Sequence, residues 1–145
     1  MTDRCVFCSI VAGTAPAERV YEDDLVVAIM DIAPAAPGHI LVIPKTHFQD
    51  LWHIHRRHAE HTMAAAVQVA HMIRRALDPA GINLMHATGA AAWQSVFHFH
   101  LRLVPRYPGD RLVPPWPLDA PRAEPAGLRA VADRIRSASD DLGRG

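Results

Sequence analysis

The chain has 145 residues (16.0 kDa); half of them are hydrophobic, and 15 basic side chains balance 15 acidic ones. This length corresponds to one domain, which can bury enough surface to fold without disulfides. A net charge of zero argues against a nucleic-acid polymer or a membrane surface as partner, because such partners select basic proteins. No apolar run approaches the roughly 20 residues that span a bilayer, and the polar N-terminus has no signal-peptide pattern. We therefore expect a single cytoplasmic domain over residues 1–145.

The first third of the chain predicts a short helix, a hairpin and a third strand. Residues 5–12 favour a helical turn before a glycine, and the segment 19–22 and the apolar run 25–29 flank an acidic turn, as in a β-hairpin. Two prolines and a glycine place a loop at 33–38. An apolar strand is expected at 39–44.

The middle of the chain predicts one long amphipathic helix. Over residues 58–77 apolar side chains recur at steps of three and four, with polar residues on the opposite side. A proline and a glycine end this helix. Two further strands are expected at 82–87 and 95–104. Strands in runs around one long helix predict an α+β fold with an antiparallel sheet.

The end of the chain differs in composition from the rest. Residues 107–145 form a proline-rich arm, in which we expect a short helix near 127–138. The tail from 139 onward is expected to fray.

The segment 94–106, Q-S-V-F-H-F-H-L-R-L-V-P-R, carries the clearest chemical signal. It alternates with the period of a strand, so that His98, His100 and Arg102 share one face and apolar side chains occupy the other. Two imidazoles and a guanidinium at steps of about 6.6–6.8 Å concentrate hydrogen-bond donors for a phosphate group. The alternative is the solvated outer face of an edge strand.

This segment resembles the histidine triad (HIT) motif, Q-x-V-x-H-x-H-x-H-x-x-P-R. Other segments follow in the family's order: C-V-F-C-S-I-V-A-G from residue 5, V-Y-E-D-D from 20, P-G-H-I-L-V-I-P-K from 37 and G-I-N from 81. The resemblance covers residues 5–106. It implies a HIT-like α+β fold with a five-stranded antiparallel sheet, one long helix and shorter terminal helices, assembled as a homodimer.

The resemblance also implies a chemistry. Family members are nucleotide hydrolases or nucleotidyl transferases that act at the α-phosphate, and the position of their nucleophile corresponds to His100. Neutral imidazole has a free lone pair near pH 7, so a covalent nucleotidyl-histidine intermediate suits this residue type. We expect a purine nucleotide conjugate as substrate. A nucleotide-binding regulator with little turnover and a zinc-stabilised dimeric interaction module are the alternatives.

Three positions depart from the family pattern. Arg102 replaces the third histidine, Trp93 replaces a glycine, and Ala87 replaces the second asparagine of G-x-N-x-x-x-N. Arg102 keeps a positive charge near the phosphates but cannot exchange protons, because a guanidinium is not deprotonated in proteins. We therefore expect substrates with good leaving groups, such as dinucleoside polyphosphates or acyl-adenylates. The Trp93 indole is expected to narrow or roof the pocket.

Cys5 and Cys8 are the only cysteines, at the spacing of metal ligands. In a reducing cytosol such a pair indicates a metal or redox site rather than a disulfide, although two buried helical cysteines would look the same. The resemblance adds His47 and His98 as ligands. A Cys₂His₂ set is closed and tetrahedral, which is typical of structural zinc.

The resemblance further implies a nucleotide pocket. By position, Val6, Phe7, Ile10 and Ile32 contact the base, although each would also suit an ordinary core. Asp31 follows an apolar run and suits the ribose hydroxyls, with a turn or cap role as the alternative. Further residues are expected to bind the phosphates or to line the site: Gln94, Ser95, the retained Asn83, and His39, for which a structural role is equally compatible. The dense histidines of 53–61 could form a metal patch, but a solvated helix start is the preferred interpretation.

Overall fold

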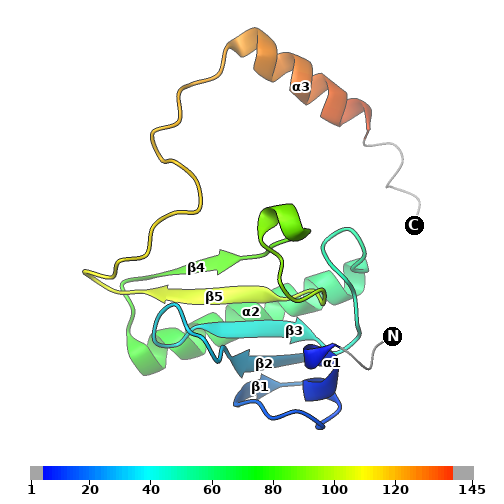
Figure 1. Cartoon of the computed structure of the whole chain (residues 1–145), viewed down its shortest axis with the longest axis vertical. Coiled ribbons are helices and arrows are strands. Elements are labelled where there is room, and N and C mark those ends of the chain that lie inside the picture. The colour runs from blue at the N-terminus through cyan, green and yellow to red at the C-terminus, as the bar shows by residue number, and fades with distance from the viewer. Residues whose placement is uncertain (1–4, 139–145) are drawn as a thin grey trace. The chain divides into compact units, whose positions relative to one another are not determined.

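The computed structural model describes residues 5–138 (Figure 1). The chain divides into two compact units, Met1–Arg111 and Leu112–Gly145. The first unit contains every described strand and is the one that carries the predicted site residues. The predicted fraying of the tail from 139 lies outside the described residues.

The first unit is built on a five-stranded antiparallel sheet with the order β1-β2-β3-β5-β4. Helix α1 precedes the first strand, α2 joins β3 to β4, and a 3₁₀ turn lies between β4 and β5. This confirms the predicted α+β architecture with one long helix. The element bounds are α1 Val6–Val11, β1 Arg19–Glu22, β2 Val26–Met30, β3 Ile40–Pro44, α2 Arg56–Leu77, β4 Gly81–Met85, η2 Ala90–Ala92 and β5 Leu101–Arg106.

The central strands are buried on both faces, which explains their unbroken apolar sequences. In β2, Val26 and Ala28 join the core cluster beneath α2, whereas Val27 and Ile29 join a second cluster with Phe7 of α1. The side-chain period of two thus distributes one strand between two layers. Figure 1 shows α2 behind the strands and α1 in front of them.

The predicted strand 95–104 differs from the structure, because β5 begins only at Leu101. The register of β3 against β5 places Val42 opposite Leu101, so that continuing the ladder by two residues would bring Phe99 opposite Pro44. Pro44 has no N–H to donate, and the ladder stops. The Phe99 N–H donates instead to the carbonyl of Phe48 at 2.6 Å. Phe97 is exposed, so the expected apolar face does not extend to it.

The other predicted elements are present with ends shifted by at most two residues. The 3₁₀ turn η2 was not predicted. The second unit carries α3, Pro125–Ser137, within the predicted arm, and its Leu128, Val131 and Ile135 are exposed. Among the described residues, no helix is both long and apolar enough to cross a membrane.

Candidate functional site

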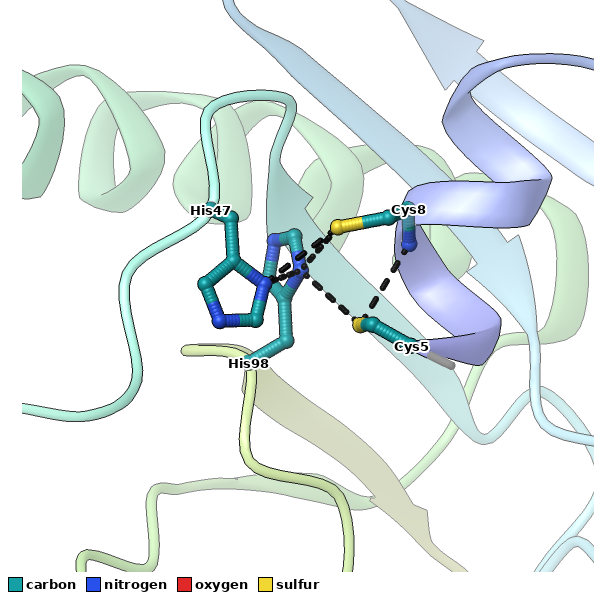
Figure 2. A group of neighbouring side chains, drawn as sticks. All are labelled: Cys5, Cys8, His47 and His98. Carbon is teal, nitrogen blue, oxygen red and sulfur yellow. Dashed lines mark hydrogen bonds between the residues drawn. The ribbon is translucent and has the colours of Figure 1, made fainter. Parts of the chain in front are cut away.

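Four side chains from three separate segments converge beside α1 (Figure 2). Cys5 is the N-cap of α1 and Cys8 lies in its first turn, while His47 follows β3 and His98 precedes β5. Their ligand atoms all lie within 4.8 Å of one another. The sequence predicted all four as one metal site, and the fold brings them together.

The separations of these atoms fit a tetrahedral zinc ion. Zn–S bonds of about 2.3 Å and Zn–N bonds of about 2.0–2.1 Å at tetrahedral angles place neighbouring ligand atoms about 3.3–3.8 Å apart. His98 Nδ1 lies 3.5 Å from Cys5 Sγ and 3.6 Å from Cys8 Sγ. His47 Nδ1 lies 3.3 Å from Cys8 Sγ and 3.1 Å from His98 Nδ1. Two thiolates and two imidazoles form a closed set with no open position, so this is a structural zinc site.

Burial and hydrogen bonding prepare His98 to act as a ligand. Its Nε2–H donates to the carbonyl of Pro44 at 2.8 Å, which leaves the lone pair of Nδ1 facing the two cysteines. Burial lowers the pKa of His98 to about 4, so the imidazole is neutral at physiological pH. Burial and the neighbouring Cys5 raise the pKa of the Cys8 thiol to about 11. Zinc binding therefore displaces a thiol proton.

The histidines of 53–61 do not form a second metal site. Across residues 5–138, the Cys₂His₂ group is the only cluster of three or more potential ligands. His53 Nδ1 lies 2.6 Å from the buried Asp50, and His61 Nε2 lies 2.8 Å from Asp23. His55 and His58 pack against Phe48. These contacts support the interpretation of this segment as a helix start.

The backbone on both sides of His100 holds its imidazole in one orientation. His100 Nδ1–H donates to the carbonyl of His98 at 2.7 Å, so the free lone pair is on Nε2. The carbonyl of His100 accepts in turn from His86 Nδ1–H at 2.9 Å, and His86 Nε2 accepts from the Thr88 hydroxyl at 2.6 Å. Burial lowers the pKa of His100, and Arg102 and His86 lower it further. A buried, neutral imidazole with one directed lone pair can act as a nucleophile.

A cavity of about 470 Å³ adjoins His100. The Phe7 ring lies edge-on to both His98 and His100, with centroids 5.8 and 5.1 Å away. One wall comes from α1, and the rest of the lining comes from β2, β3, the loop between them, β5 and the segment before β5. Eight of the predicted catalytic and nucleotide-binding residues line this cavity: Val6, Phe7, Ile10, Asp31, Ile32, Ser95, His100 and Arg102.

Asp31 and His39 stand together on the cavity wall. Asp31 Oδ1 accepts from the Ala33 N–H at 2.8 Å, so the carboxylate also has the turn role considered as its alternative. His39 Nδ1 accepts from the Ala35 N–H at 3.0 Å, which leaves the proton on Nε2. That Nε2–H is buried without a hydrogen-bond partner and lies 3.5 Å from Asp31 Oδ2. Burial lowers the pKa of His39, so it is a neutral donor beside a carboxylate.

Arg102 supplies positive charge at the same cavity. It is half-buried on β5, opposite Leu41 of β3 and Met85 of β4. Its guanidinium has no hydrogen bond or ion pair to any described residue. A half-buried guanidinium next to His100 has its donors available for a bound anion.

The structure does not bring every predicted residue to the cavity. Asn83 lies on the edge strand β4, where its Oδ1 accepts from Arg106 at 3.0 Å. The buried Gln94 side chain accepts from the Gly89 N–H and donates to the carbonyls of Gln49 and Val96. Gln94 therefore shapes the loop that leads to His98 and does not face the cavity.

Trp93 does not roof the cavity either, because its side chain is 67% exposed and is not part of the lining. Its φ of +69° lies in the left-handed region. Glycine, the residue of the family pattern, adopts that conformation without strain, whereas a residue with a side chain is destabilised there by roughly 1–2 kcal/mol. Ile32 lies at the cavity mouth and is almost fully exposed.

Sequence reasoning missed the role of His86. It anchors the carbonyl of His100 and stacks on Phe99, with ring centroids 4.5 Å apart. Fourteen residues separate the two histidines, and only the pairing of β4 with β5 brings them together. No spacing rule could have identified this contact.

Comparisons with known proteins agree with this geometry. Residues 12–109 match the HIT domain family. The chain is 37% identical over 134 residues to "Protein hit" of Bacillus subtilis, covering 92% of each chain. It is 32% identical over 133 residues to "Adenylylsulfatase HINT3" of Arabidopsis thaliana, covering 92% of this chain and 66% of that one. A crystal structure of a Zn-bound histidine triad family protein from Mycobacterium smegmatis superposes with a TM-score of 0.73 at 39% identity, covering 95% and 99% of the two chains. The chain therefore belongs to the HIT family, and Cys5, Cys8, His47 and His98 are its zinc site.

Proposed function

We propose that this protein is a nucleotide hydrolase or nucleotidyl transferase that acts at the α-phosphate of a purine nucleotide conjugate. The observation that carries the proposal is the orientation of His100, whose Nδ1–H is bound to the His98 carbonyl at 2.7 Å. Its Nε2 lone pair is thereby free for a phosphate in the adjoining cavity, beside the guanidinium of Arg102, which has no partner among residues 5–138. The relative named as an adenylylsulfatase supports an activity on adenylyl compounds.

The reaction proceeds in two displacements at phosphorus. His100 Nε2 forms a bond to the α-phosphorus while the bond to the leaving-group oxygen breaks, and the electron pair departs with that oxygen. Water or another hydroxyl acceptor then attacks the phosphorus while the N–P bond breaks; the electron pair of that bond returns to Nε2, which restores the neutral imidazole, and the proton of the acceptor is released to solvent. The Arg102 guanidinium and the exposed Ser95 hydroxyl stabilise the phosphate oxygens in both steps.

The pocket favours a nucleoside with an apolar contact to its base. Val6, Phe7 and Ile10 supply an apolar wall, which suits a purine ring without strong base selection. The Asp31 carboxylate accepts from the ribose hydroxyls. The Ala33 N–H donates to its Oδ1 and keeps that carboxylate in place, with the His39 Nε2–H 3.5 Å from Oδ2.

Arg102 selects the leaving group. The other ionisable residues of the cavity are Asp31, His39 and His100, and burial keeps both imidazoles neutral. The cavity therefore lacks a group that is protonated at neutral pH and can release its proton. Mixed anhydrides, whose leaving groups depart as stable anions, are the expected substrates. Dinucleoside polyphosphates and acyl-adenylates belong to this class.

Covalent labelling tests the proposal. The protein is incubated with α-³²P-labelled diadenosine tetraphosphate, and acid-labile label is sought on the chain and on the H100A variant. H71A is the matched control, because His71 is an exposed histidine of α2 with no part in the cavity. Label on the wild type and H71A that is lost in H100A supports the enzyme. Nucleotide binding without label supports a regulator, and neither binding nor label supports an interaction module.

We also infer that the protein is a homodimer joined along β4. This strand is the edge of the sheet, and all five of its residues are exposed. Its free backbone groups and its apolar Ile82, Leu84 and Met85 would pair well with the same strand of a second copy. Such pairing would extend the sheet from one protomer into the next.

A further inference from the structure

Helix α1 belongs to two sites at once. Cys5 and Cys8, at its start, are zinc ligands. Val6, Phe7 and Ile10, between and after them, line the cavity beside His100. The metal site and the nucleotide pocket thus lie on two sides of one short helix.

This helix is too short to be stable without help from its surroundings. It has six residues, whereas isolated helices below about 12–15 residues are marginal in water. Its apolar contacts come from Phe7 and Ile10, which are buried against β2 and β3. Val6 is 48% exposed and stays over the cavity only while the first turn is held in place. The bonds from Cys5 and Cys8 to a zinc ion would hold that turn.

A second connection runs through His98 to the nucleophile. The imidazole of His98 is a zinc ligand, and its carbonyl accepts the hydrogen bond that orients His100. The segment from His98 to His100 precedes β5, so no sheet ladder fixes the His98 peptide. Its orientation depends on the Phe99 N–H of the same peptide, which donates to the carbonyl of Phe48 next to His47, and on the two ends of the His98 ring, at the metal site and at Pro44. Phe7 touches both imidazoles and joins this connection to the one through α1.

We propose that Cys5, Cys8, His47 and His98 are positioning residues for the nucleotide pocket, so that zinc occupancy and nucleotide binding favour each other. The inference rests on the proposed function, because it needs a nucleotide in this cavity. Coupling between two sites is reciprocal at equilibrium. Zinc must strengthen nucleotide binding, and a bound nucleotide must strengthen zinc binding by the same factor.

The experiment measures both directions with AMP as probe. Isothermal titration calorimetry gives the Kd of AMP for zinc-loaded and zinc-free protein, and competition with a chromophoric chelator gives the zinc affinity with and without saturating AMP. Typical coupling between sites is about 5- to 150-fold, so we expect AMP to bind at least about five-fold more weakly without zinc. The zinc affinity should rise by an equal factor when AMP is bound.

Substitutions at His47 distinguish the effect of losing a zinc ligand from the effect of disturbing the pocket wall. This residue is exposed and lies outside the cavity lining, so its replacement leaves the pocket wall intact. H47A should lower the affinities for zinc and AMP together. H47C, which keeps a ligand atom, should restore both, and H71A should change neither.

Three results would overturn the inference. The first is an equal Kd for AMP in the loaded and zinc-free proteins. The second is a loss of the global fold on zinc removal, seen by circular dichroism, because the coupling would then reflect unfolding and not positioning. The third, no AMP binding by the loaded wild type, would also overturn the proposed function, whereas the first two would leave it standing.

Discussion

Replacing Arg102 by histidine reverses the change that most distinguishes this chain from its family's motif. The position is half-buried on β5, between Leu41 and Met85, and the smaller imidazole fits there without crowding. The R102H variant loses a fixed charge beside the phosphate and gains a group that can carry a proton. We expect opposite effects on two kinds of substrate.

For an anhydride such as diadenosine tetraphosphate, kcat/KM should fall. The guanidinium has no described protein partner, so its hydrogen bonds to the phosphate are available in full. Hydrogen bonds to charged groups contribute about 1.5–3 kcal/mol, which corresponds to roughly 10- to 150-fold in rate. For adenosine 5′-phosphoramidate, whose amine must be protonated to leave, kcat/KM should rise, because general acid catalysis contributes about 10²–10⁴-fold.

The assay follows AMP release chromatographically for both substrates, and R102Q is the matched control. R102Q removes the charge without adding a titratable group, so it should lose anhydride turnover and gain nothing on the phosphoramidate. Comparable kcat/KM for the two substrates in the wild type would refute the reasoning. So would an unchanged preference in R102H.

Three other changes test the remaining features of the site and its assembly. D31N keeps the Oδ1 acceptor for Ala33 but loses the negative charge that would face the ribose hydroxyls. Calorimetry should show AMP binding weakened by roughly 10-fold or more, with little change for the 2′,3′-dideoxy analogue. Equal losses for both nucleotides would contradict a ribose role. Burial lowers the pKa of His100 from its ordinary value of 6.5, so the nucleophile stays neutral as the pH falls through 6.5. The acid limb of the kcat/KM profile should therefore lie below that pH. A limb centred at or above pH 6.5 would contradict this expectation. L84D places a charge on the exposed edge strand and should convert a dimer to monomers in sedimentation velocity, an expectation that a monomeric wild type at micromolar concentration would rule out.

Much of the fold follows from local patterns in the sequence. The unbroken apolar runs of β2 and β3 and the period of three to four in α2 identify the sheet and its helix, because each pattern reflects which side chains are buried. The start of β5 does not follow from such a pattern. Alternation continues back to His98, but Pro44 on the neighbouring strand lacks the N–H that the ladder would need. That obstacle lies more than 50 residues away in the sequence.

The candidate site likewise has some features that follow from the sequence and others that do not. Spacing indicated Cys5 and Cys8, and the resemblance to the HIT motif added His47 and His98 as ligands and His100 as the expected nucleophile. Tertiary structure alone decided the orientation of each group: the His98 carbonyl sets the tautomer of His100, and His86 of the adjoining segment fixes the His100 backbone. It also turned Gln94 toward backbone groups and away from the cavity. Side-chain identity is local information, whereas the hydrogen-bond partner of a buried group depends on segments that only folding brings into contact.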